Sequence, residues 1–159
     1  MSPNKLVLPS SVQTRSDVAR LVKEIVEYEE LARQAGLRGV RVPGPNHLSV
    51  PLRATAEVFR VALDDPMARR KFSDRLKYLH KAAPVVQISF AVQPPMHVVD
   101  SVLSWFRTNG HPATLVRVSV DPSVVVGCRI RTTNKSFDFS FARLLDEAQK
   151  TLAQEVSAL

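Results

Sequence analysis

The sequence contains few side chains whose types and spacing could perform catalysis. Its four histidines are scattered, with no pair at positions i and i+4 and no HExxH pattern, so it carries no recognisable zinc motif. It also lacks a GxGxxG, GxSxG or Gly-Lys-Ser/Thr segment that would hold a nucleotide, a nucleophile or a phosphate group. The single cysteine, Cys128, falls on the apolar side of an expected strand, which favours a buried small hydrophobe over a nucleophile. These absences predict a non-catalytic protein without a cofactor or a metal.

Two aspartates come nearest to a catalytic pair. Asp121 and Asp138 could be imagined as the carboxylates of a general acid and a general base. Each is expected at a turn or a helix cap, however, where an aspartate side chain accepts hydrogen bonds from nearby backbone amides. We therefore expect both residues to hold the fold.

The most distinctive chemical feature of the chain is its positive charge. The formal net charge is +7, and nearly all of the excess lies in residues 1–83. The cations are densest in one expected helix and comprise Arg69, Arg70, Lys71, Arg75, Lys77 and Lys81. Such a patch attracts an acidic protein surface, a nucleic acid or an anionic lipid, whereas the simplest alternative is a solvated helix face without a partner.

The first part of the chain is expected to form a helical region of about three helices. Apolar residues at helical spacing predict a first helix over residues 16–35, capped by Ser16 and ended by Gly36. A second helix is expected to begin near residue 49, with a proline in its first turn. A third helix is expected over residues 67–81, behind an Asp-Pro start.

The second part of the chain alternates strand and helix. The expected strands and the last helix span residues 85–92, 114–120, 128–133, the short segment that carries Phe137 and Phe139, and residues 141–156. A further helix should connect the first two strands. The pattern predicts an α+β protein, with a helical region over residues 1–83 and a small β-α-β-β-β-α domain over residues 84–159. Its sheet should be mixed, with one parallel pair across the helical connection and antiparallel neighbours.

The stretch VDPSVVVGCRIRTTNKSFDFSFARLL, residues 120–145, resembles the signature of the delta subunit (the oligomycin-sensitivity-conferring protein) of F-type ATP synthases. In that family a V-D-P-S-x-x-G-G segment leads into a strand, a G-[DN]-K turn, a D-x-S step and a closing helix. The residues that match, in this order and without a gap, are Val120, Asp121, Pro122, Ser123, Gly127, Asn134, Lys135, Asp138, Ser140 and Leu144. Val126 and Thr133 stand where the family usually has glycine. The resemblance covers about residues 84–150.

The resemblance implies a non-catalytic stator subunit that links the catalytic head of a proton-translocating synthase to its peripheral stalk. In the family a six-helix N-terminal bundle grips the head, and the C-terminal domain meets the end of the stalk; no cofactor is involved. The helical region of this chain is shorter than that bundle. The expected location is the cytoplasm, peripheral to the inner face of the cell membrane, and no apolar stretch has the length of a signal peptide or a membrane span.

The signature residues are expected to hold the fold, and the exposed cations are the candidate contacts with partners. The candidate contacts are Arg69, Arg70, Lys71, Arg75 and Lys77 on the third helix, and Arg117, Arg129 and Arg131 on the charged side of the strands. An alternative function also follows from the charge, namely a basic nucleic-acid-binding module, although aromatic residues make up only 6% of the chain.

Overall fold

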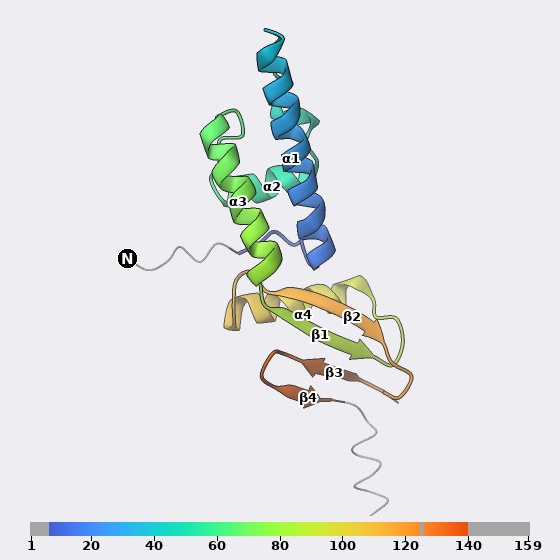
Figure 1. Ribbon diagram of the computed structural model, residues 1–159. Helices are drawn as coiled ribbons and strands as arrows, with labels where there is room; N and C mark the ends of the chain where they lie inside the picture. The colour runs from blue at the N-terminus through green and yellow to red at the C-terminus, as the bar shows by residue number, and fades with distance from the viewer. Residues whose placement is uncertain (1–6, 125, 140–159) are drawn as a thin grey trace, which may run out of the picture. The chain divides into compact units, whose positions relative to one another are not determined.

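The computed structural model describes residues 7–124 and 126–139, which form an α+β fold (Figure 1). Its elements in chain order are α1 (Arg15–Leu37), a 3-10 turn (Pro45–His47), α2 (Val50–Val58), α3 (Pro66–Ala82), β1 (Val85–Phe90), α4 (Met96–Asn109), β2 (Leu115–Val120), β3 (Cys128–Arg131) and β4 (Ser136–Asp138). The expected fold class is confirmed. The helix expected over residues 141–156, with Ser140 and Leu144, lies outside the described residues.

The chain divides into two compact units, each described by itself below. The first unit comprises Met1–Pro84 and Val102–Leu115, and the second comprises Val85–Ser101 and Val116–Leu159. The division after Pro84 lies beside the boundary expected between residues 83 and 84. In addition, the first unit takes in the second half of α4.

Helix α1 begins earlier than its apolar pattern predicts. Thr14, rather than the predicted Ser16, is the N-cap, because its hydroxyl oxygen accepts a hydrogen bond from the amide of Asp17 (3.2 Å). The Asp17 carboxylate accepts in return from the amide (2.8 Å) and the hydroxyl (2.8 Å) of Thr14. This reciprocal pair is a capping box, which satisfies amides that the first turn leaves without helical partners.

The end of α1 also differs from the prediction. Gly36 is helical, and Gly39 is the residue that adopts the positive φ of 67°. The amides of Gly39 and Val40 donate back to the carbonyl oxygens of Gly36 and Ala35, which is the hydrogen-bond pattern of a Schellman motif. The predicted stop at Gly36 is therefore wrong, because the glycine that a left-handed residue requires lies at position 39.

Helices α2 and α3 begin where the sequence predicts. The Ser49 hydroxyl caps α2 and the Asp65 carboxylate caps α3, each with proline in the first turn. Helices α1 and α3 pack against each other, and α1 also contacts α2. The largest fully buried side chains of this helical core include Val12, Val18, Ile25, Leu52, Phe72 and Leu76.

The sheet is mixed, with the strand order β2-β1-β3-β4. The amide of Leu115 donates to the carbonyl of Pro84, and the amide of Asp121 donates to that of Phe90, at the same sequence offset, so β1 and β2 run parallel. Strand β3 pairs antiparallel with β1, and β4 pairs antiparallel with β3. This confirms the predicted arrangement of one parallel pair with antiparallel neighbours.

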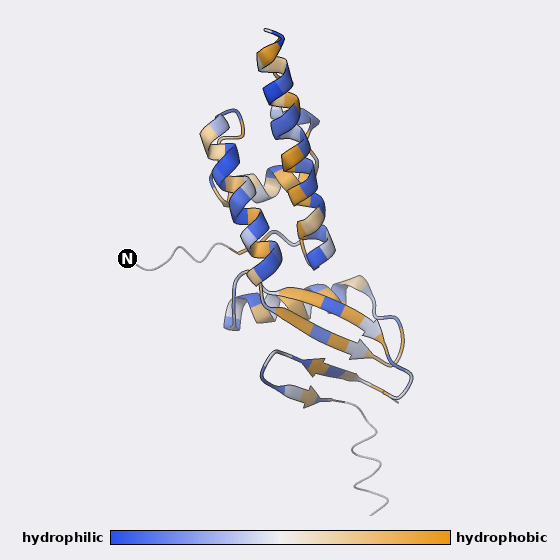
Figure 2. Ribbon diagram, in the orientation of Figure 1, coloured by the Kyte–Doolittle hydropathy of each residue, from blue (hydrophilic) through white to orange (hydrophobic). Residues whose placement is uncertain are grey.

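The register gives the sheet an apolar and a polar face, visible as alternating colours along the strands (Figure 2). The apolar face carries Val86, Ile88 and Phe90 of β1, all buried. The opposite face carries polar side chains in rows that cross the strands, because Gln87 lies opposite Arg131, and Ser89 lies opposite Arg129. We name this surface the polar sheet face.

Candidate partner-binding surfaces

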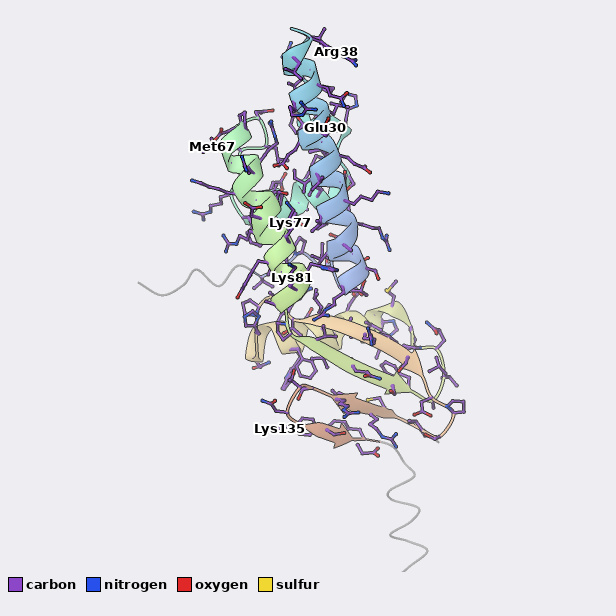
Figure 3. The ribbon with its side chains drawn as sticks, viewed as in Figure 1. Glu30, Arg38, Met67, Lys77, Lys81 and Lys135 are labelled. Atoms are coloured by element: carbon purple, nitrogen blue, oxygen red, sulfur yellow. The ribbon has the colours of Figure 1, made fainter. Side chains whose placement is uncertain are left out.

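Helix α3 presents a dense row of exposed cations in the first unit. Arg70, Lys71, Arg75, Lys77 and Lys81 are all exposed, and Asp74 is the acidic residue among them. Lys77 and Lys81 are marked along this helix in Figure 3. Lys77 pairs with Asp74 (3.6 Å), and the Arg75 guanidinium lies 4.5 Å from the centroid of the Phe59 ring. Four of the five α3 residues proposed as partner contacts therefore lie on an accessible surface.

Arg69 is the exception, and its assignment as a partner contact is corrected. Only 6% of Arg69 is exposed, because position 69 lies on the same helical face as the buried Phe72, Ser73 and Leu76. Its Nη1 donates to the carbonyl oxygens of Leu63 (2.7 Å) and Asp64 (3.2 Å). The guanidinium also lies 5.3 Å from the ring centroid of Tyr28 in α1. Arg69 thus fixes the turn between α2 and α3 against α1.

An open groove of about 590 Å³ runs between α1 and α3. Its charged lining residues are Arg33, Arg69, Arg70, Lys77, Glu29 and Asp74. Arg33 is held by Glu30 in a short ion pair (2.7 Å), and Lys77 is paired as described above. Because both signs of charge line it and several cations have partners, this groove has the character of a charged protein surface rather than of a small-molecule site.

The polar sheet face of the second unit brings together the three strand arginines that the sequence singles out. The parallel register places Arg117 beside Gln87, which lies opposite Arg131 on β3 and so forms one row across three strands. In the next row the hydroxyls of Ser119 and Ser89 lie 3.0 Å apart, followed by Arg129 and Asp138. Arg117 and Arg131 are exposed, and Arg129 is half-buried.

Arg129 connects two separate parts of the sequence signature. Its guanidinium lies 3.7 Å from the Asp121 carboxylate and 3.2 Å from that of Asp138. Asp121 also accepts from the amide (2.9 Å) and the hydroxyl (2.7 Å) of Ser123, which closes the turn at Pro122. These Ser123 hydrogen bonds, and to a lesser extent the charge of Arg129, hold the pKa of Asp121 below its usual value. Two carboxylates that share one arginine suit structural support, and the lowered pKa of Asp121 is the opposite of what a general acid needs.

The remaining described signature residues shape the hairpin. Gly127 has a φ of 96°, a conformation that L-residues with a Cβ rarely adopt, at the entrance to β3. In the β3–β4 turn, Thr132 and Lys135 exchange hydrogen bonds: the Thr132 amide donates to the Lys135 carbonyl (2.8 Å), and the Lys135 amide donates to the Thr132 hydroxyl (3.1 Å). Asn134 and Lys135 are exposed at this turn, and Lys135 is marked in Figure 3. These signature residues therefore lie at turns whose backbone conformation favours particular residue types.

Cys128 lies on the apolar face, as expected, but it is half-buried rather than buried. Burial and, secondarily, the charge of Asp138 raise the pKa of its thiol. A raised pKa keeps the sulfur protonated at neutral pH and lowers its reactivity. The neighbouring Phe137 and Phe139 are 43% and 62% exposed, and their rings stack with centroids 6.3 Å apart.

Arg107 is a central residue that the distribution of charge along the sequence does not reveal. It is 4% exposed and lies in the part of α4 that belongs to the first unit. Its guanidinium donates to the carbonyl oxygens of Leu8 (2.9 Å), Pro9 (3.1 Å), Val12 and Thr114 (3.1 Å). Burial lowers the pKa of Arg107 to about 10, so it stays charged at neutral pH. We call this arrangement the Arg107 clasp.

Within residues 7–124 and 126–139, no three histidine, cysteine, aspartate or glutamate side chains are grouped so that they could hold a metal ion. In the same part of the chain, no helix has the length and apolar character needed to cross a membrane.

No protein-family model matches the sequence, and the search of curated proteins gives no match either. The described residues define an α+β protein, with the exposed cations of α3 on one unit and the polar sheet face on the other.

Proposed function

We propose that this protein is a non-catalytic stator subunit of a proton-translocating F-type ATP synthase, linking the catalytic head to the peripheral stalk. The observation that carries the proposal is the placement of the signature residues. Asp121 directly follows β2 and Asp138 ends β4, and both lie against Arg129. A turn, a glycine with positive φ and a hairpin occur where the family signature has conserved types of residue.

The charged surfaces fit a linking role. The first unit offers the exposed cations of α3, and the second unit offers the polar sheet face. Surfaces of this kind contribute to the rate and specificity of association more than to affinity, since exposed ion pairs are weak individually. A subunit with two such surfaces on separate units can bind two partners at once.

The proposal is tested by an affinity pull-down of the tagged full chain from its own cells, with membranes included, at moderate salt. One half of the sample is treated with nuclease before capture, so that proteins held only through nucleic acid are lost. The expected result is recovery of catalytic-head and peripheral-stalk subunits in both halves, identified by mass spectrometry. Recovery of nucleic acid and its processing proteins without synthase subunits would overturn the proposal.

The second candidate function is a nucleic-acid-binding module, supported by the exposed cations of α3. It predicts binding to an oligonucleotide that weakens by about 0.9 log unit per log unit of salt for each phosphate contact. A filter-binding titration over a range of salt concentrations measures this slope.

A further inference from the structure

Of the three arginines on the polar sheet face, one forms ion pairs with carboxylates of the described residues and two do not. Arg129 is held between Asp121 and Asp138. Arg117 and Arg131 are exposed, and no carboxylate in the described part of the chain pairs with either. The two available arginines lie in one row, with Gln87 of the central strand β1 between them.

The spacing of this row restricts what can bind it. Neighbouring strands lie about 4.8 Å apart, so the backbones of Arg117 and Arg131, two strand spacings apart, are about 10 Å from each other. On an α-helix, side chains at positions i and i+7 lie on one face and are separated by about 10.5 Å. Two carboxylates two helical turns apart on a partner helix therefore match the two guanidinium groups. The helix residue midway between these carboxylates then falls over Gln87.

We propose that the polar sheet face binds an acidic α-helix of a partner protein that lies across the strands, with carboxylates at i and i+7 paired to Arg117 and Arg131. This proposal rests on the proposed function, and it names the surface that binds the partner and the chemistry of that partner. Charge complementarity selects the sign of the partner, and the row spacing selects the register of its acids.

The arrangement favours a protein partner over a nucleic acid on this face. Single-stranded nucleic acid needs cations and stacking rings on the same surface. Here the exposed rings of Phe137 and Phe139 belong to the apolar face, because Phe137 lies opposite Ile130, whereas Arg117 and Arg131 lie on the other side of the sheet. Edge addition of a strand is a different mode, since it would use β2 or β4 backbone groups rather than the arginine row.

The test uses the 17.7 kDa full chain, labelled with 15N for NMR. The probes are helix-forming peptides of about twenty residues, one with Glu at i and i+7 and one with Glu at i and i+4, at equal net charge. The i, i+7 peptide is expected to shift the backbone signals of Gln87, Arg117 and Arg131, with an affinity roughly three- to tenfold higher than that of the i, i+4 peptide.

Variants of matched charge provide the controls. The double substitution Arg117→Glu/Arg131→Glu should abolish the peptide-induced shifts. The neutral double substitution Arg117→Gln/Arg131→Gln should abolish them too. The signals of all other residues show whether each variant keeps the fold. Arg70→Glu/Lys71→Glu, which changes the net charge equally on α3, should leave the preference for the i, i+7 peptide intact. Equal affinity for both peptides, or shifts centred on α3, would overturn the proposal, as would tighter binding of a single-stranded oligonucleotide to the same row.

A second measurement distinguishes failure of this inference from failure of the proposed function. If the Arg117→Glu/Arg131→Glu protein still captures stalk subunits from cells as well as the unchanged protein does, the surface assignment is wrong and the stator role stands. If the unchanged protein captures no synthase subunit, the stator role is wrong, and the peptide titration decides on the surface alone.

Discussion

Arg69 and Arg107 place positive charge beneath the surface of the helical unit, and neither forms an ion pair with a carboxylate of residues 7–124 and 126–139. Both donate to backbone carbonyl oxygens of irregular segments instead. Such carbonyl groups would otherwise be buried without donors, at a cost of about 1–3 kcal/mol each. These two arginines therefore act as internal caps for loops, a role that their charge alone does not suggest.

A sequence signal for both arginines exists in the helical spacing. Arg107 continues the stripe of Val99 and Leu103 at intervals of four residues, and Arg69 shares a face with Phe72 and Leu76. Counting charges along α3 places Arg69 with its exposed neighbours, whereas its position relative to the apolar stripe places it inside. The carbonyl partners could not be predicted, because they lie up to 99 residues away in the sequence.

Loss of the Arg107 clasp should destabilise the protein strongly. Arg107→Met keeps the apolar stem but removes the guanidinium donor from the carbonyl oxygens of Leu8, Val12 and Thr114, whereas Pro9 keeps the amide of Val12. We therefore expect the free energy of unfolding to fall by about 3 kcal/mol. Chemical denaturation measures this change. Arg131→Met, which alters an exposed arginine, should change the value by less than about 0.5 kcal/mol, and equal effects of the two substitutions would contradict the role of the clasp.

Two glycines should respond in opposite directions to alanine. Gly127→Ala forces a Cβ into a backbone with a φ of 96°, so we expect a loss of about 1–2 kcal/mol in the free energy of unfolding. Gly36→Ala lies in the helix α1 with nothing within 4 Å of the added Cβ, and it should stabilise by about 0.5–1 kcal/mol. Thermal unfolding of both variants tests the pair, and stabilisation by Gly127→Ala would show that the hairpin relaxes to another conformation.

At the scale of the elements, the predicted helices and strands of the described residues are confirmed, and their ends are the less accurate part. The apolar repeat of α1 identifies the helix because Val18, Leu21 and Ile25 must share the buried face. The same repeat does not fix the cap, since Thr14, Ser16 and their neighbours are all compatible with it. Hydrogen bonding by Asp17 selects Thr14, and that choice depends on local geometry that the pattern of apolar residues does not contain.

The capping box gives α1 a pH-dependent contribution to stability. Partial burial raises the pKa of Asp17, but hydrogen bonds from Thr14 and Gln13 and the charge of Arg20 together outweigh it, so the pKa lies below its ordinary value of 3.8. A carboxyl group whose pKa is lower in the folded state stabilises the protein above its unfolded pKa, and this contribution is lost as the pH falls through the folded pKa.

Asp17→Asn should therefore cost about 1 kcal/mol of unfolding free energy at pH 7, because the ionised cap is lost. The difference from the unchanged protein should persist down to about pH 5 and shrink below about pH 4. Urea denaturation at a series of pH values measures it. Glu27→Gln, on the exposed face of the same helix, should show little difference at any pH, and a constant penalty for Asp17→Asn at low pH would argue against the ionised cap.

At the scale of the whole molecule, the two exposed charged surfaces belong to separate units and should be separable by mutation. Under the proposed stator function, Arg70→Glu/Lys71→Glu should reduce capture of catalytic-head subunits roughly three- to tenfold at moderate salt and leave capture of stalk subunits unchanged. Quantitative mass spectrometry of the pull-down measures both classes of partner. Parallel loss of both classes would mean that a single surface, or the net charge alone, is responsible for the binding.

The candidate surfaces were predictable only in part. Alternation along the strands places Arg117, Arg129 and Arg131 on one side of the sheet, and the register confirms that they share the polar sheet face. The division between an occupied Arg129 and two available arginines could not be predicted. It depends on Asp121 and Asp138, which come together with Arg129 only when the sheet has formed.

The Arg107 clasp also has a consequence for synthesis on the ribosome. Leu8 leaves the peptidyl-transferase centre 99 residues before Arg107 does, which at about 5–20 residues per second is a delay of roughly 5–20 s. During this time α1, α2 and α3 can form and pair, while the carbonyl groups of the N-terminal segment are still bonded to water. The helical unit is therefore completed only after α1, α2 and α3 have been made, when the second half of α4 emerges from the exit tunnel and Arg107 binds the segment of Leu8 and Val12.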